Sequence, residues 1–152
     1  RREFPDFPEH GLAGEGHFHA GNAQARTGLA QWFAVAERGL KAALDRDERA
    51  GSHRIWPHHF DLGCLVDLGE GRGVGLGLSP GDALFEQPYL YAYAFPTPAA
   101  YRPCDGPRGR LHTEGFHGYV LLGDELLDGE HPDKDAEIFF RHALSCAETS
   151  LG

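Results

Sequence analysis

The feature that most constrains the fold is a pair of segments in which every second residue is of one kind. In residues 73–78 glycine alternates with valine or leucine, and in residues 89–95 tyrosine alternates with leucine or alanine, until a phenylalanine ends the run. A side-chain period of two is typical of a β-strand, whose successive side chains point to opposite faces of the sheet. The two segments therefore predict two strands, one with a glycine stripe and the next with an aromatic stripe.

Two interpretations of these stripes stay open. Glycines inside a strand leave space above the sheet, and the rings of Tyr89, Tyr91 and Tyr93 on the next strand are suited to fill it. The alternative is a shallow ligand groove over a glycine floor, lined by these tyrosines and by Asp82. A phosphate-binding loop is excluded, because the segment lacks the Lys-Ser/Thr pair of a P-loop and opens no helix.

The remaining periodicity predicts a single α+β domain over residues 1–152. Apolar residues at three- and four-residue intervals predict an N-terminal helix over 23–49 and a C-terminal helix over 133–149. Asn22 is the expected N-cap of the first helix, Gly51 its expected stop, and Gly39 a position of kinking or close contact. The helices are expected to flank a four-stranded, mainly antiparallel sheet with strands over 59–68, 73–79, 88–95 and 110–122. Residues 1–21, rich in glycine and proline, are expected to form an extended arm.

Composition excludes several classes of protein. The chain of 152 residues carries a net charge of −9, which argues against binding to nucleic acid, since a nucleic-acid binder needs a basic surface. No apolar stretch is long enough for a membrane span. Three cysteines, an odd number, do not form a disulfide framework. With no signal-peptide pattern at residue 1, we expect a cytoplasmic protein.

Two segments pair a histidine with a carboxylate on one expected strand face. His59 and Asp61 stand at the start of the first strand, and His112 and Glu114 in the fourth. If these strands were neighbours, the four side chains would form a mixed nitrogen and oxygen ligand set that suits zinc, manganese or iron. Structural hydrogen bonding and an acid/base site without a metal are the alternatives.

Four ordered segments carry a family resemblance. They are Trp56-Pro57-His58-His59-Phe60-Asp61, Gly77-Leu78-Ser79-Pro80-Gly81-Asp82, Glu86-Gln87-Pro88-Tyr89-Leu90-Tyr91 and His112-Thr113-Glu114-Gly115-Phe116. In this order they resemble a family of uncharacterised bacterial proteins with W-P-x-H-F-D, S-P-G-D, E-P-Y-x-Y and H-T-E-G segments. The resemblance covers about residues 55–122. It supports the fold unit and implies no activity.

Three functional hypotheses follow from these observations. The first is a bacterial domain that binds a small molecule on the tyrosine-lined sheet face. The second is a metal-dependent hydrolase or related enzyme that holds a divalent ion with His59, Asp61, His112 and Glu114 and uses it to activate water. The third is a structural protein that forms a homodimer through the helix of residues 22–50 and the N-terminal arm.

Overall fold

The structure, a computed structural model, describes residues 22–57, 59–103, 106 and 108–152. The predicted arm over 1–21 lies outside the described residues. The elements follow in the order α1 (Ala23–Ala43), β1 (Arg54–Trp56), β2 (Asp61–Gly69), β3 (Arg72–Ser79), β4 (Tyr89–Phe95), β5 (Arg110–His112), β6 (Gly118–Leu122), α2 (Gly123–Leu127) and α3 (Pro132–Leu151).

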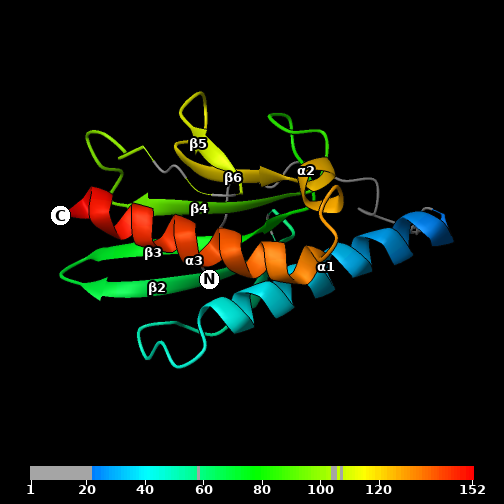
Figure 1. The fold of residues 1–152 in the computed structure, drawn as a ribbon, viewed down its shortest axis with the longest axis horizontal. Coiled ribbons are helices and arrows are strands. Elements are labelled where there is room, and N and C mark those ends of the chain that lie inside the picture. The colour runs from blue at the N-terminus through cyan, green and yellow to red at the C-terminus, as the bar shows by residue number, and fades with distance from the viewer. Residues whose placement is uncertain (1–21, 58, 104–105, 107) are drawn as a thin grey trace, which may run out of the picture.

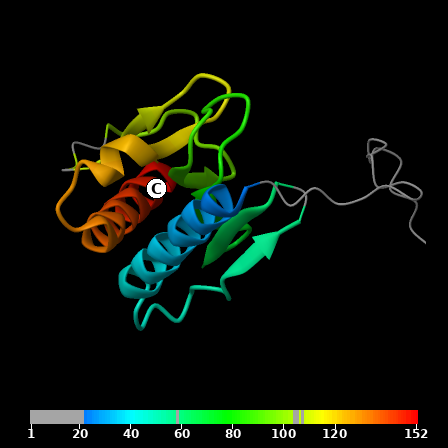
Figure 2. The same cartoon turned by 90° about the vertical axis from the view of Figure 1, so that its right-hand side faces the viewer.

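The strands form one antiparallel sheet in the order β1-β2-β3-β4-β6-β5. The two long helices, α1 and α3, lie side by side on the same face of this sheet (Figures 1 and 2). Helix α3 packs over β4 and β3, whereas α1 packs over β2 and β3. The α+β class and the two flanking helices are therefore confirmed.

The sheet has six strands rather than the four that we predicted. Strand β1 has only three residues, which is too short for a periodicity to show. The predicted strand over 110–122 is two antiparallel strands, because a turn at residues 113–117 separates β5 from β6. Gly115 in this turn has φ +79°, a left-handed conformation that favours glycine. The chain therefore reverses where we expected a continuous strand.

Helix α1 begins as predicted but ends earlier. The Asn22 side chain accepts a hydrogen bond of 2.7 Å from the Ala25 N–H, which confirms the N-cap. The helix ends at Ala43 instead of residue 49. The reason is local: Arg46 has φ +64°, and the Asp47 carboxylate accepts hydrogen bonds from the backbone and the guanidinium of Arg49. These contacts form a turn in place of two more helical turns.

The core lies between the sheet and the two long helices. One face of each central strand contributes to it, with alternating positions pointing the other way. Small residues bring the layers together, since a Cβ built on Gly39 of α1 would lie 2.7 Å from the Ala136 Cβ of α3. The close contact expected at Gly39 is therefore confirmed. The largest fully buried side chains in the core are Tyr119, Phe139, Phe140, Leu40, Leu76, Leu78, Leu90, Leu121 and Leu126.

Candidate functional site on the open face of the sheet

The face of the sheet opposite α1 and α3, called here the open face, carries the aromatic stripe. The register pairs Gly77 with Tyr91 and Gly75 with Tyr93, so the glycine and tyrosine stripes lie side by side on this face. Four large apolar side chains on the same face are exposed: Trp56 by 45%, Leu65 by 53%, Tyr93 by 38% and Phe95 by 59%. An antiparallel sheet with one solvated face normally carries polar residues there, so this surface is unusually apolar.

The rings of Tyr93 and Tyr91 lie over Gly75 and Gly77. A Cβ built on Gly75 would lie 2.5 Å from Cζ of Tyr93 and 2.8 Å from its hydroxyl oxygen. A Cβ built on Gly77 would lie 2.5 Å from the Tyr91 hydroxyl oxygen. Neither distance leaves room for a real Cβ, so these two glycines are needed for the rings to reach the sheet. The predicted aromatic cover is confirmed at these two positions, where the rings occupy the space above the glycine floor.

Two carboxylates fix two of the tyrosine hydroxyls. The Tyr89 hydroxyl donates to Oδ2 of Asp82 at 2.8 Å, and the Tyr91 hydroxyl donates to Oδ2 of Asp61. Burial and the bond to Asp82 raise the pKa of Tyr89 to about 12. Burial and the bond to Asp61 likewise raise the pKa of Tyr91 well above its ordinary value. Both phenols are therefore neutral donors at pH 7, and neither is poised to act as an acid.

Both oxygens of the Asp82 carboxylate accept hydrogen bonds within the chain. Its Oδ1 accepts the backbone N–H groups of Leu84 at 2.8 Å and Phe85 at 3.0 Å. Partial burial opposes ionisation, but the hydrogen bonds from Phe85, Tyr89 and Leu84, with a contribution from His59, bring the pKa of Asp82 below its ordinary value. Asp82 thus holds residues 82–85 and Tyr89 in place.

The Asp61 carboxylate differs, because only one of its oxygens is satisfied. Its Oδ1 is buried and receives no hydrogen bond from any residue that the structure describes. Trp56 is its register partner on β1, and a Cβ on neighbouring Gly63 would lie 3.1 Å from the indole Nε1 and 3.2 Å from the Tyr91 hydroxyl oxygen. An indole, a phenol and a carboxylate from three strands therefore converge above Gly63. We call this convergence the Gly63 site.

Two loop residues extend the aromatic surface. The ring of Phe116, from the turn between β5 and β6, lies 6.4 Å from Tyr91 and 6.3 Å from Tyr93, edge to face. Phe85 packs at 4.8 Å against Tyr89 and at 5.0 Å against His112. Sequence patterns did not single out Phe85, Phe116 or Trp56 as site residues, because they lie in turns or in a three-residue strand where alternation cannot be seen.

The structure separates the four side chains of the metal hypothesis. Strands β3, β4 and β6 stand between β2 and β5, so the first and fourth predicted strands are not neighbours. His59 lies before β2 in a turn where Phe60 has φ +56°, and the Nε2 of His112 donates to the backbone carbonyl of Glu114 at 2.7 Å. Within the described ranges, no group of three or more His, Cys, Asp or Glu side chains is arranged to hold a metal ion. The condition on which that ligand set depended is therefore not met.

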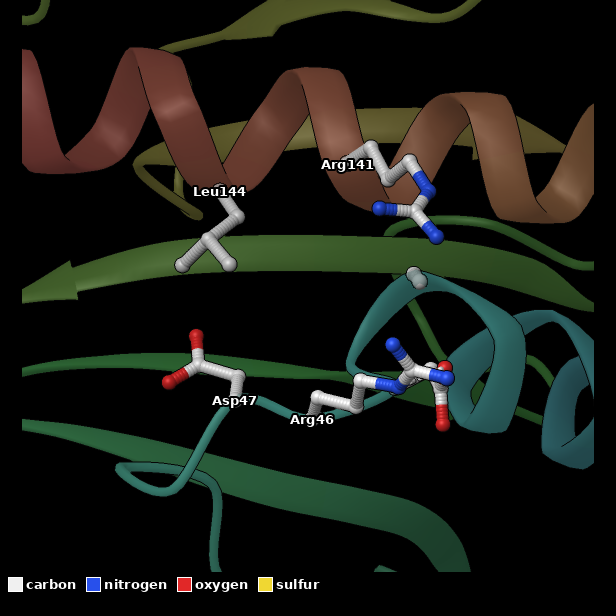
Figure 3. A pocket seen from close by; sticks show the side chains of 6 residues that line it. Arg46, Asp47, Arg141 and Leu144 are labelled. Carbon is white, nitrogen blue, oxygen red and sulfur yellow. Dashed lines mark ion pairs between the residues drawn. The ribbon is translucent and has the colours of Figure 1, made fainter.

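A cavity of about 430 Å³ lies elsewhere, between the turn after α1 and helix α3 (Figure 3). Arg141 and Leu144 approach it from α3, while Arg46 and Asp47 approach it from the turn. Its charged groups already have partners: Asp47 binds Arg49 at 2.7 Å, and Arg141 donates to the Ala42 carbonyl. Because its charges are balanced within the chain, this cavity offers less for recognition than the Gly63 site.

The cysteines and the helices can be compared with the predicted cytoplasmic location. Cys64 is free and buried, whereas Cys146 is disulfide-bonded; Cys104 lies outside the described residues. Disulfides are rare in the cytoplasm, so Cys146 does not support the predicted location. None of the helices in the described part of the chain is long and apolar enough to cross a membrane.

Comparisons of the chain with protein-family models, with curated proteins and with solved structures find no match. The resemblance of the four segments to an uncharacterised bacterial family therefore stays a prediction.

Proposed function

We propose that the chain is a binding module whose open face takes a small organic ligand at the Gly63 site. The observation that carries this proposal is the buried Oδ1 of Asp61, which lacks a hydrogen-bond donor among the described residues. A buried acceptor left without a donor costs about 1–3 kcal/mol, and more when the group is charged. A donor group on a ligand would remove this penalty on binding.

The surroundings of Asp61 are already organised for binding. Tyr91 is held by its hydroxyl bond to Asp61 and lies over Gly77, with Tyr93 and Phe116 against its ring. A ligand therefore meets rings and a carboxylate whose conformations are fixed before it arrives, which lowers the entropy lost on binding. The exposed indole of Trp56 beside the carboxylate supplies apolar contact.

A fragment screen followed by backbone amide NMR tests this proposal. We expect bound fragments to shift the amide signals of Gly63, Gly77 and Tyr91 more than those around the Arg141 cavity. Asp61→Asn should weaken binding about tenfold or more, since a hydrogen bond to a charged group contributes about 1.5–3 kcal/mol.

Asp67→Asn is the matched control. Asp67 lies on the same face of β2, and its Oδ1 accepts the Gly69 N–H at 2.8 Å, a bond that asparagine can also accept. This variant should bind as the wild type does. The proposal fails if no fragment shifts the open-face signals, or if Asp61→Asn and Asp67→Asn weaken binding equally.

A further inference from the structure

The carboxylates of the open face are not neutralised by neighbouring lysine or arginine. Asp61 and Asp82 form no ion pair with either residue type in the part of the chain that the structure describes. Arg54 is the cross-strand partner of Gly63, yet its Nε donates to the Ser52 hydroxyl at 3.3 Å instead of pairing with Asp61. The chain as a whole carries a charge of −9. The Gly63 site is thus negative and partly shielded from water.

Aromatic ring faces add to this negative character. The centre of an aromatic ring face attracts cations, most strongly in tryptophan and then in tyrosine. Over Gly63 the Nε1 edge of the Trp56 indole meets the Tyr91 hydroxyl, and the Tyr93 ring lies 6.2 Å from that of Tyr91. Trp56 and Tyr93 remain 45% and 38% exposed, so their rings are accessible from solvent.

We propose that the ligand of the Gly63 site is an organic cation with an N–H donor, such as a primary ammonium group. This inference rests on the proposed binding function and specifies its ligand. The ammonium displaces the groups that cover the buried Oδ1 of Asp61 and hydrogen-bonds to this oxygen, while its alkyl chain packs on Trp56 and Tyr93. Anions are disfavoured by the two carboxylates. A neutral polyol could contact the same rings and donate a hydrogen bond to the same oxygen. It would gain no electrostatic attraction to the carboxylate or to the rings.

The test compares three probes with the same pentyl chain: n-pentylammonium, pentan-1-ol and pentyltrimethylammonium, each titrated into the ¹⁵N-labelled protein. At low salt we expect n-pentylammonium to bind about tenfold more tightly than the alcohol, because charge pairing and cation–π attraction add to the shared apolar contact. The trimethylated cation should bind between the two, since it has no N–H for Asp61. Raising the ionic strength should weaken only the cations.

Three variants test the role of charge in binding. Asp61→Asn should bring the ammonium and the alcohol to within about twofold of each other, whereas Asp67→Asn should leave their ratio unchanged. Arg54→Gln removes the positive charge of the residue that pairs with Gly63 on β1, and should tighten binding of the ammonium about two- to threefold without changing that of the alcohol.

The possible outcomes separate the two proposals. If the alcohol binds as tightly as the ammonium at the open face, the charge inference is overturned while the binding function stands. The same holds if Arg54→Gln weakens binding of the ammonium. If neither these probes nor any fragment of the screen shifts the open-face signals, both proposals are overturned.

Discussion

The tyrosine cover of β3 predicts that Gly75→Ala destabilises the chain through one ring alone. The three atoms nearest to a Cβ built on Gly75 all belong to the Tyr93 side chain, with Cζ at 2.5 Å. Inserting a methyl group into a packed position costs about 1–3 kcal/mol. Alanine recovers about 0.5–1 kcal/mol through the lower entropy of the unfolded chain. We therefore expect a net loss of about 1 kcal/mol in the free energy of unfolding.

The double variant isolates the contact between the two side chains. When Tyr93 is replaced by alanine, the steric conflict disappears, and Gly75→Ala in that background should be neutral or stabilising by up to about 1 kcal/mol. Urea denaturation followed by tryptophan fluorescence gives all four free energies of the cycle. An equal loss from Gly75→Ala with and without Tyr93 would show that the ring does not lie over this glycine.

Gly77 provides the contrasting position. A Cβ there would collide with the Leu62 backbone carbonyl as well as with the Tyr91 hydroxyl. Removing the ring cannot relieve a conflict with backbone, so Tyr91→Ala should fail to rescue Gly77→Ala. The loss from Gly77→Ala should reach about 3 kcal/mol or more. Rescue of both glycine variants by loss of their tyrosines would contradict the register described here.

Three further predictions concern other parts of the chain. The pKa of Tyr89 is about 12 in the folded chain against about 10 for a free phenol, so the unfolded chain loses this proton first. Stability should fall by about 1.4 kcal/mol per pH unit between pH 10 and 12 on account of this group, and Tyr89→Phe should reduce the measured slope by about that amount in a denaturation series, leaving the part due to Tyr91. In denaturant without reductant, iodoacetamide should modify Cys64 and leave Cys146 unmodified, as peptide mass spectrometry would show. Gly39→Leu should lower the free energy of unfolding by about 3 kcal/mol, because its side chain would separate α1 from α3 at Ala136; a loss below 1 kcal/mol would contradict the close packing.

The local periodicity predicted the helices and the central strands well, for a physical reason. A stripe of apolar residues or a strict alternation records which side of an element is buried. Helix α3 and strands β2 to β4 bury one side along most of their length, and α1 does so from Ala36 to Ala43. The end of α1 was missed because it depends on one left-handed residue, Arg46, and on the side-chain contact between Asp47 and Arg49. Neither has a periodic signal.

The four side chains of the metal hypothesis do not come together, for two reasons that the sequence does not record. It required β2 and the fourth predicted strand to be neighbours, but strand order is decided by packing of the whole sheet, and three strands separate β2 from β5. It also extended the alternation of β2 back to His59, whereas the left-handed Phe60 breaks that alternation. Within the regular strands the alternation was right: Asp61 points away from Leu62, and Tyr89, Tyr91 and Tyr93 share one side of β4.

Glycine on β3 explains how a sheet with helices on only one face still buries large aromatic rings on the other. Strand β4 points Ala92 and Ala94 toward α3, where little space is left, and its tyrosines toward the open face. In the part of the chain that the structure describes, no second helix layer covers these rings, but the missing side chains of Gly75 and Gly77 let Tyr93 and Tyr91 lie against the sheet. Tyr89, whose partner on β3 is Ser79, packs instead against Phe85 and is only 7% exposed. The hydroxyls of Tyr91 and Tyr89 then require acceptors at the level of the strands, which Asp61 and Asp82 supply.

The two carboxylates differ in their second oxygen. The second oxygen of Asp82 accepts hydrogen bonds from its own loop, whereas the second oxygen of Asp61 accepts none from the described residues. The packing of the rings therefore leaves one unmatched acceptor beside the exposed indole of Trp56, and this asymmetry between the two carboxylates is what distinguishes the Gly63 site from the rest of the open face.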